Sequence, residues 1–232
     1  MRTGRSLTLS RVPSVGVDPF FAVKAEINCD LHLVRTTSDE FFARAEPFAH
    51  FDQPVVDLAF IDGMHLAEFA LRDLINTERH CHPASVIVID DVLPRSVDEG
   101  GRGRSGSAAD GGPWAGDVYK VIEVLRRHRP DLVVLEIDTS PTGTLVVMLP
   151  DPHDTTLSGA YDDLVRELVV PDPQHVPDWA LSRSRAIDPL VLLRAPIWDA
   201  LLEARGRRPD HAKEALRHAL VTAGLLTAQG NP

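Results

Sequence analysis

The chain has 232 residues, of which 44% are hydrophobic and 25% are charged. This length is enough for one sizeable hydrophobic core and too short for several independent domains. The formal net charge of −10, from 34 acidic and 24 basic residues, disfavours nucleic acid and anionic membranes as partners. We therefore expect the chain to act on a small molecule.

The chain shows no signal of export or membrane insertion. No apolar run approaches the ~20 residues of a membrane helix, and residues 1–10 are polar and basic where a signal peptide is apolar. We therefore expect a cytoplasmic protein. Cys29 and Cys81 are far apart and belong to no CxxC pair, which predicts two free, buried thiols.

Short apolar segments alternate with helical patterns through the first two thirds of the chain. Their near-continuous apolar character is typical of strands buried on both faces of a parallel sheet. The predicted strands are 15–17, 31–34, 55–61 and 85–89. After the second strand, Thr37 and Glu40 have the spacing of a capping box, which predicts a short helix ending near Pro47. Its buried side would carry Phe41, Phe42 and Ala45.

Two further helices follow from apolar residues at helical spacing. The first would bury Ala67, Ala70, Leu71, Leu74 and Ile75. The second begins after Trp114, with Asp117 in its first turn, basic residues 126–128 in its last turn and Pro130 beyond its end. Its inner stripe would be Val118, Val121, Ile122 and Leu125.

The last two predicted strands, 132–137 and 144–149, are separated only by residues 138–143. This connection is too short for the crossover of a parallel pair, so the two strands must form an antiparallel hairpin. The expected fold class is therefore α/β: a Rossmann-like, doubly wound, mostly parallel sheet that ends in an antiparallel hairpin.

Two regions stand outside this pattern. Residues 95–112 are rich in glycine and serine and form a long loop, which either covers an active site or is a disordered insertion. From Pro150 onward, helical segments 157–168, 188–204 and 209–225 are punctuated by prolines. We interpret residues 1–150 as an α/β domain and 151–232 as a C-terminal helical appendage. The appendage would pack on the sheet, form a homo-oligomer contact or shape a substrate pocket.

Acidic residues follow two neighbouring strands at the points where these strands end. Asp62 comes directly after one strand, and Asp90 and Asp91 come directly after the next. Because the carboxyl ends of parallel strands open into one crevice, these carboxylates should converge, and a hard cation such as Mg²⁺ would relieve their repulsion. His65, three residues after Asp62, would face the same crevice as a general base. The alternatives are helix caps for the aspartates and a solvated loop position for His65.

The segments FIDGMH, IDD and GVDP resemble the class I S-adenosylmethionine-dependent methyltransferases, in particular the bacterial branch that includes the macrolide sugar O-methyltransferases. The resemblance covers about residues 3–150. It implies that Asp62, Asp90 and Asp91 bind magnesium and that His65 is the base. It also implies that Asp18 binds the cofactor ribose.

The same resemblance implies a first strand and a glycine-rich turn that hold the methionine part of the cofactor. Only Gly4 is similar to the end of that turn, and no segment for the strand precedes it in this chain. We expect either a natural protein that begins further upstream or a form that binds the cofactor poorly, and we favour the first. Ser38 would reach the adenine or act as a helix N-cap, and Asp62 would complete the cofactor set.

These observations predict an S-adenosylmethionine-dependent O-methyltransferase for a small hydroxylated metabolite, with magnesium as a second cofactor. Two alternatives remain open at this point. One is a degenerate methyltransferase-like binding module without catalysis, and the other is a magnesium-dependent hydrolase that uses the same carboxylates. Two further motifs have no assigned role: Trp114, Gly116, Asp117 and Lys120 form a WxGDxxK pattern, and HCHP lies at residues 80–83.

Overall fold

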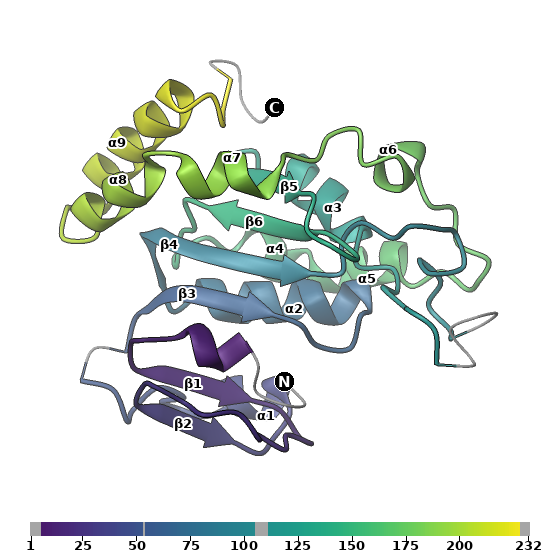
Figure 1. Ribbon diagram of the computed structural model, residues 1–232, viewed down its shortest axis with the longest axis horizontal. Coiled ribbons are helices and arrows are strands. Elements are labelled where there is room, and N and C mark those ends of the chain that lie inside the picture. Colours follow the sequence, from purple (N-terminus) through teal and green to yellow (C-terminus); the bar gives the residue numbers. More distant parts are fainter. Residues whose placement is uncertain (1–5, 53, 105–110, 228–232) are drawn as a thin grey trace. The chain divides into compact units, whose positions relative to one another are not determined.

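The structure is a computed structural model that describes residues 6–52, 54–104 and 111–227 (Figure 1). The chain folds as two compact units, Met1–Val55 and Val56–Pro232. This division does not fall near Pro150, where the composition changes.

The first unit contains a parallel pair of strands, β1 (Ser14–Val17) and β2 (Leu31–Val34). A short 3₁₀ turn (Ser6–Leu9) precedes them and α1 (Ser38–Phe42) follows. The predicted capping box is confirmed: the Thr37 side chain accepts a hydrogen bond from the Glu40 backbone, and the Glu40 carboxylate accepts one from Thr37 N–H. The box therefore fixes the start of α1.

The predicted end and inner face of this helix are partly wrong. The helix ends at Phe42, well before Pro47, and Ala45 is exposed. Phe41 is buried as predicted and Phe42 is half-buried. Phe41 packs against Phe48, with ring centroids 5.3 Å apart in an edge-to-face arrangement. An aromatic side chain beyond Pro47, rather than Ala45, thus completes this apolar contact.

The second unit contains a four-stranded sheet in the order β3-β4-β6-β5. Strands β3 and β4 are parallel, and β6 is antiparallel to both of its neighbours, so the predicted terminal hairpin is confirmed. The strands are β3 (Val56–Ile61), β4 (Cys81–Asp90), β5 (Val133–Ile137) and β6 (Thr144–Met148). In the described residues the strands form two sheets rather than one continuous sheet.

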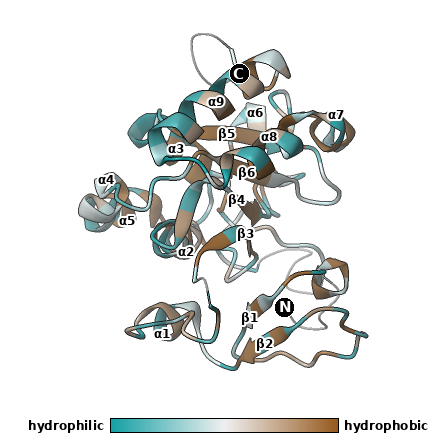
Figure 2. Cartoon of the chain, turned by 90° about the vertical axis from the view of Figure 1, so that its left-hand side faces the viewer, coloured by the Kyte–Doolittle hydropathy of each residue, from teal (hydrophilic) through white to brown (hydrophobic). Residues whose placement is uncertain are grey.

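Helices cover both faces of the larger sheet, as expected for a mixed α/β unit (Figures 1 and 2). The helices are α2 (Ala67–Glu78), α3 (Lys120–His128), α4 (Thr156–Gly159), α5 (Tyr161–Leu168), α6 (Asp178–Leu181), α7 (Pro189–Arg194), α8 (Ile197–Ala204) and α9 (Pro209–Thr222). Apolar residues of α2, α3 and α5 pack in one core cluster, and those of α7, α8 and α9 pack in the other.

Alternation along the strands divides the core into these two layers. Ile87 and Ile89 of β4 face the layer of α2 and α3, whereas Val86 faces the layer of α8 and α9. All residues predicted for the inner stripes of α2 and α3 are buried. The segments after Pro150 are therefore part of the same core as the sheet: α5 packs in the layer of α2 and α3, and α7, α8 and α9 form the other layer.

Strand β3 departs from the predicted burial on both faces. It is the edge strand of its sheet, and its Leu58 and Phe60 side chains are 67% and 50% exposed.

Strand β4 begins at Cys81 rather than at residue 85, so most of the HCHP motif belongs to the first residues of this strand. Both cysteines are free as predicted, but only Cys81 is buried and Cys29 is half-buried.

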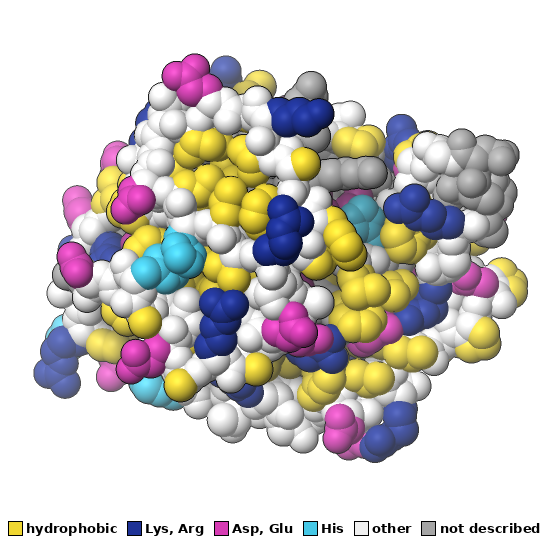
Figure 3. Space-filling model, turned by 90° about the horizontal axis from the view of Figure 1, so that it is seen from below, with side chains coloured by type: hydrophobic (Ala, Val, Ile, Leu, Met, Phe, Trp, Pro, Cys, Tyr) yellow, Lys and Arg dark blue, Asp and Glu magenta, His cyan; other side chains and the backbone are white. Residues whose placement is uncertain are grey.

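Acidic and basic side chains are interspersed on the face shown in Figure 3, with hydrophobic side chains between them. That face therefore carries no continuous patch of one sign. Among the described residues, no helix has the length and apolar character needed to cross a membrane.

Candidate active site

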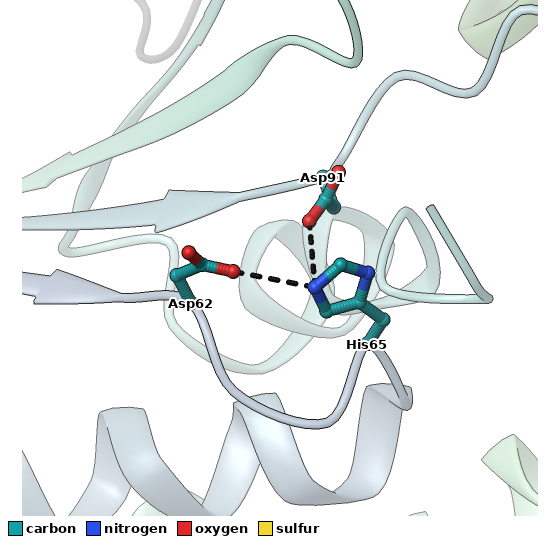
Figure 4. Close-up of side chains that lie close together, drawn as sticks. All are labelled: Asp62, His65 and Asp91. Atoms are coloured by element: carbon teal, nitrogen blue, oxygen red, sulfur yellow. Dashed lines mark hydrogen bonds and ion pairs between the residues drawn. The ribbon is translucent and has the colours of Figure 1, made fainter. Parts of the chain in front are cut away.

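The acidic residues lie where two parallel strands end side by side. Ile61 of β3 lies opposite Ile89 of β4, so Asp62 and the Asp90–Asp91 pair occupy the same edge of the sheet. His65 lies on the turn between β3 and α2 (Figure 4). The structure thus brings residues from two neighbouring strand ends to one place, as the sheet geometry predicts.

His65 stands between the two carboxylates. Its Nε2 atom is 3.2 Å from Asp62 Oδ1 and 3.0 Å from Asp91 Oδ2 (Figure 4). These three potential ligand atoms all lie within 4.8 Å of one another. The side chain of Asp62 is 39% exposed whereas that of Asp91 is 11% exposed, so the cluster opens to solvent on the Asp62 side.

A small pocket surrounds this cluster. Its lining combines the three side chains with apolar residues from β3, β4, α2 and the segment before α3. The lining residues are Ile61, Asp62, Gly63, Met64, His65, Ala70, Ile89, Asp90, Asp91 and Val118. The apolar walls lower the local dielectric constant, which strengthens electrostatic interactions on the Asp91 side of the pocket, where the cluster is more buried.

Two residues of the cluster have a left-handed backbone. His65 has a φ of 55° and Asp91 a φ of 63°, a region that non-glycine residues rarely adopt and in which His and Asp are enriched. Leu149 and Arg183 share this conformation outside the cluster. Each such residue costs of the order of 1–3 kcal/mol, and this kind of strain is frequent at functional sites.

Asp90 lies beside the cluster rather than within it. It lines the pocket, and its carboxylate accepts a hydrogen bond from the backbone N–H of Asp91. Burial, together with the charge of Asp91, raises the pKa of Asp90 to about 6. The structure therefore brings Asp62, His65 and Asp91 together and places Asp90 as an adjacent half-buried acid.

The pKa values of the other groups respond to the same crowding. Burial, with the charges of Asp62 and Glu99, raises the pKa of Asp91 although His65 opposes this. Burial alone would lower the pKa of His65, but the hydrogen bond that protonated Nε2 donates to Asp62, together with the charge of Asp91, outweighs it and raises that pKa. The site therefore favours positive charge among its carboxylates, from a proton or from a cation.

The residues predicted for the cofactor lie mainly in the first unit. Asp18 follows β1 and Ser38 begins α1 shortly after β2. Because Val17 lies opposite Val34 in this parallel pair, Asp18 and Ser38 follow strands that end at the same edge of the pair. Thr37 rather than Ser38 is the N-cap of α1, so the capping role considered for Ser38 is wrong. Gly4 lies outside the described residues.

Asp117 occupies a different place from the one predicted. Helix α3 begins at Lys120, and Asp117 lies before it, fully buried. Its Oδ1 atom accepts a hydrogen bond of 2.9 Å from Ala67 N–H at the start of α2, while Arg102 and Lys120 bind its Oδ2 atom. The WxGDxxK spacing was the available signal, but the partner is some fifty residues away in the sequence.

The HCHP motif has no metal-binding geometry. His82 Nε2 is 2.8 Å from Asp57 Oδ1, and burial raises the pKa of Cys81 to about 12, which keeps its thiol protonated. Within the described part of the chain, the only group of three His, Cys, Asp or Glu residues with metal-binding spacing is Asp62, His65 and Asp91.

Residues 14–92 match the model of a family described as a methyltransferase domain. The matched segment is about a third of the chain, runs from β1 to just beyond β4, and contains Asp18, Ser38, Asp62, His65, Asp90 and Asp91. No curated protein and no solved structure matches the chain. The family match supports a methyltransferase domain in this part of the protein.

Proposed function

We propose that the chain is an S-adenosylmethionine-dependent O-methyltransferase that acts, with magnesium, on a hydroxyl of a small sugar or other polyol-bearing metabolite. The observation that carries the proposal is the convergence of the Asp62 and Asp91 carboxylates on His65 Nε2, inside the segment that matches a methyltransferase domain. Such a convergence supplies a base and anionic ligands at one point.

The donor set suits magnesium. Carboxylate oxygens are the ligands that this hard cation prefers, and the ligand atoms of the cluster lie within 4.8 Å of one another. The raised pKa of Asp90 and of Asp91 reflects burial and mutual repulsion that a divalent cation would relieve. Asp62, Asp90 and Asp91 would hold the ion.

The residues of the first unit suit the cofactor. Asp18 would bind the ribose hydroxyls with its carboxylate, and Ser38 would approach the adenine, because both follow strand ends at one edge of the β1–β2 pair. Gly4 and Asp62 complete the proposed cofactor set.

When bound, S-adenosylmethionine supplies an activated methyl group and magnesium makes an acceptor hydroxyl more acidic. His65 Nε2 would accept the proton of that hydroxyl as the hydroxyl oxygen bonds to the methyl carbon, while the bond between that carbon and the cofactor sulfur breaks and S-adenosylhomocysteine leaves. Asp62 and Asp91 then stabilise the resulting imidazolium, which they already contact through Nε2. The remaining task of the chain is to position the reactants, since the methyl group is already activated.

Titration calorimetry with S-adenosylmethionine, with and without Mg²⁺, tests this proposal against its alternatives. We expect the native chain to bind both, and Asp62→Asn to bind Mg²⁺ at least tenfold more weakly. Asp163→Asn, which changes an exposed acid of α5, is the matched control and should bind as the native chain does. Binding of Mg²⁺ without S-adenosylmethionine would favour a hydrolase, and binding of the cofactor without Mg²⁺ would contradict the metal assignment.

A further inference from the structure

The segment of residues 114–117, here called the Trp114 segment, lies directly against the base. The backbone carbonyl oxygen of Trp114 is 2.9 Å from His65 Nδ1. A carbonyl oxygen only accepts hydrogen bonds, so Nδ1 must carry a hydrogen in this arrangement. The indole of Trp114 also stacks on the imidazole, with ring centroids 5.2 Å apart and 16° between the ring planes.

Gly116 permits this close approach. Its φ is +64°, and a Cβ atom at this position would lie 1.7 Å from the His65 carbonyl oxygen and 2.8 Å from the carbonyl carbon. Both atoms belong to the backbone, so a rotamer change cannot relieve the clash. Any side chain at position 116 must therefore move the Trp114 segment away from His65.

Hydrogen bonds to residues other than His65 also hold the Trp114 segment in place. The backbone N–H groups of Ala115 and Gly116 both donate to the Glu99 carbonyl oxygen, each over 3.0 Å. The indole Nε1–H of Trp114 donates to the Gly101 carbonyl oxygen over 2.8 Å. Asp117 at the end of the segment caps α2, which begins two residues after His65. The segment and the residues after the base are thus fixed to each other.

We propose that Trp114 and Gly116 are positioning residues for His65. The Trp114 carbonyl accepts a hydrogen bond from Nδ1, and the stacked indole fixes the plane of the ring. Nε2 is therefore held between Asp62 and Asp91, within hydrogen-bond distance of both carboxylates. The part of this inference that concerns proton transfer rests on the proposed function, whereas the ring orientation rests on these contacts alone.

Ring nitrogen NMR tests the orientation without any substrate. In the ¹⁵N-labelled full chain, free of metal, ¹H–¹⁵N spectra report how fast a hydrogen on Nδ1 of His65 exchanges with water. His65→Asn identifies the His65 signals by their loss. A hydrogen bond of ordinary strength should slow this exchange by about 2- to 12-fold relative to an unrestrained imidazole. We expect slow exchange in the native chain and its loss in Gly116→Ala.

Three variants separate positioning from general loss of structure. Trp114→Phe keeps a stacking ring and should retain the slow exchange at Nδ1, whereas Trp114→Ala should speed this exchange about as much as Gly116→Ala does. Trp198→Phe removes a similar hydrogen bond, from an indole N–H to the Leu192 carbonyl, and should leave the His65 spectrum unchanged. Because Trp114→Ala introduces no clash, it keeps the test available if Gly116→Ala does not fold.

Exchange at native Nδ1 as fast as in an unrestrained imidazole, or native-like spectra in both Gly116→Ala and Trp114→Ala, would overturn the inference. These spectra need neither cofactor nor acceptor. A chain that shows the expected slow exchange but transfers no methyl group would therefore count against the proposed function and leave the positioning inference standing.

Discussion

The substitution Asp90→Asn offers a quantitative test of the crowded acidic site. The pKa of Asp90 is raised to about 6 in the folded protein from an ordinary value of 3.8, first by burial and then by the charge of Asp91. The folded state therefore holds a proton that the unfolded state releases. This stabilisation is complete below pH 3.8 and is lost as the pH rises through about 6. A rise of the pKa from 3.8 to about 6 corresponds to at most about 3 kcal/mol, and solvent screening reduces this because Asp90 is only partly buried.

Asparagine keeps the shape of this side chain and its acceptor for the backbone N–H of Asp91, but it cannot ionise. In EDTA, the variant should therefore be more stable than the native chain by up to about 3 kcal/mol at pH 7.5, with a much smaller difference at pH 4.5. Urea unfolding followed by tryptophan fluorescence measures both differences. Adding Mg²⁺ at pH 7.5 should reduce the stability difference between the native chain and Asp90→Asn, because a bound cation balances the carboxylate charge in the native chain.

Asp163→Asn serves as the control, since it removes an acid from an exposed ion pair on α5. If the stability difference between the native chain and Asp90→Asn were the same at both pH values, burial and repulsion at Asp90 would not act as described here.

Three further predictions concern the core, the metal and the base. Arg129→Ala should lower the free energy of unfolding by about 3–5 kcal/mol in urea, because it leaves buried Glu78 without its partner, whereas Arg166→Ala at an exposed pair should change it by less than about 1 kcal/mol. Mg²⁺ should raise the melting temperature of the native chain and raise that of Asp91→Asn by less, and equal responses in thermal unfolding would count against Asp91 as a ligand. His65→Ala should slow methyl transfer from labelled cofactor by about 10²- to 10⁴-fold with cofactor binding retained, and near-native rates would exclude His65 as the base.

The sequence predicts the elements of the second unit because their patterns are local. The apolar spacing of α2 and α3 sets their buried faces, and the short connection between β5 and β6 leaves only a hairpin. The convergence of Asp62 and Asp91 also follows from sequence, since parallel strand order alone places their strand ends together.

The remaining features depend on contacts between residues far apart in the chain. Asp117 has the sequence position of a first-turn residue in α3, yet it caps α2 across fifty residues. The exposure of Phe60 depends on the edge position of β3, which no local pattern encodes. The contact between Gly116 and His65 is likewise visible only once both backbones are placed.

A crystal structure of the protein with Mn²⁺ and S-adenosylhomocysteine tests the central claim most directly, because Mn²⁺ replaces Mg²⁺ and gives an anomalous signal. We predict an anomalous peak at about 2.2 Å from carboxylate oxygens of Asp62 and Asp91, a distance typical of hard divalent cations with oxygen ligands, with the cofactor sulfur facing the same pocket. Ordered Mn²⁺ or cofactor bound elsewhere, with the Asp62–His65–Asp91 cluster unchanged, would contradict the account.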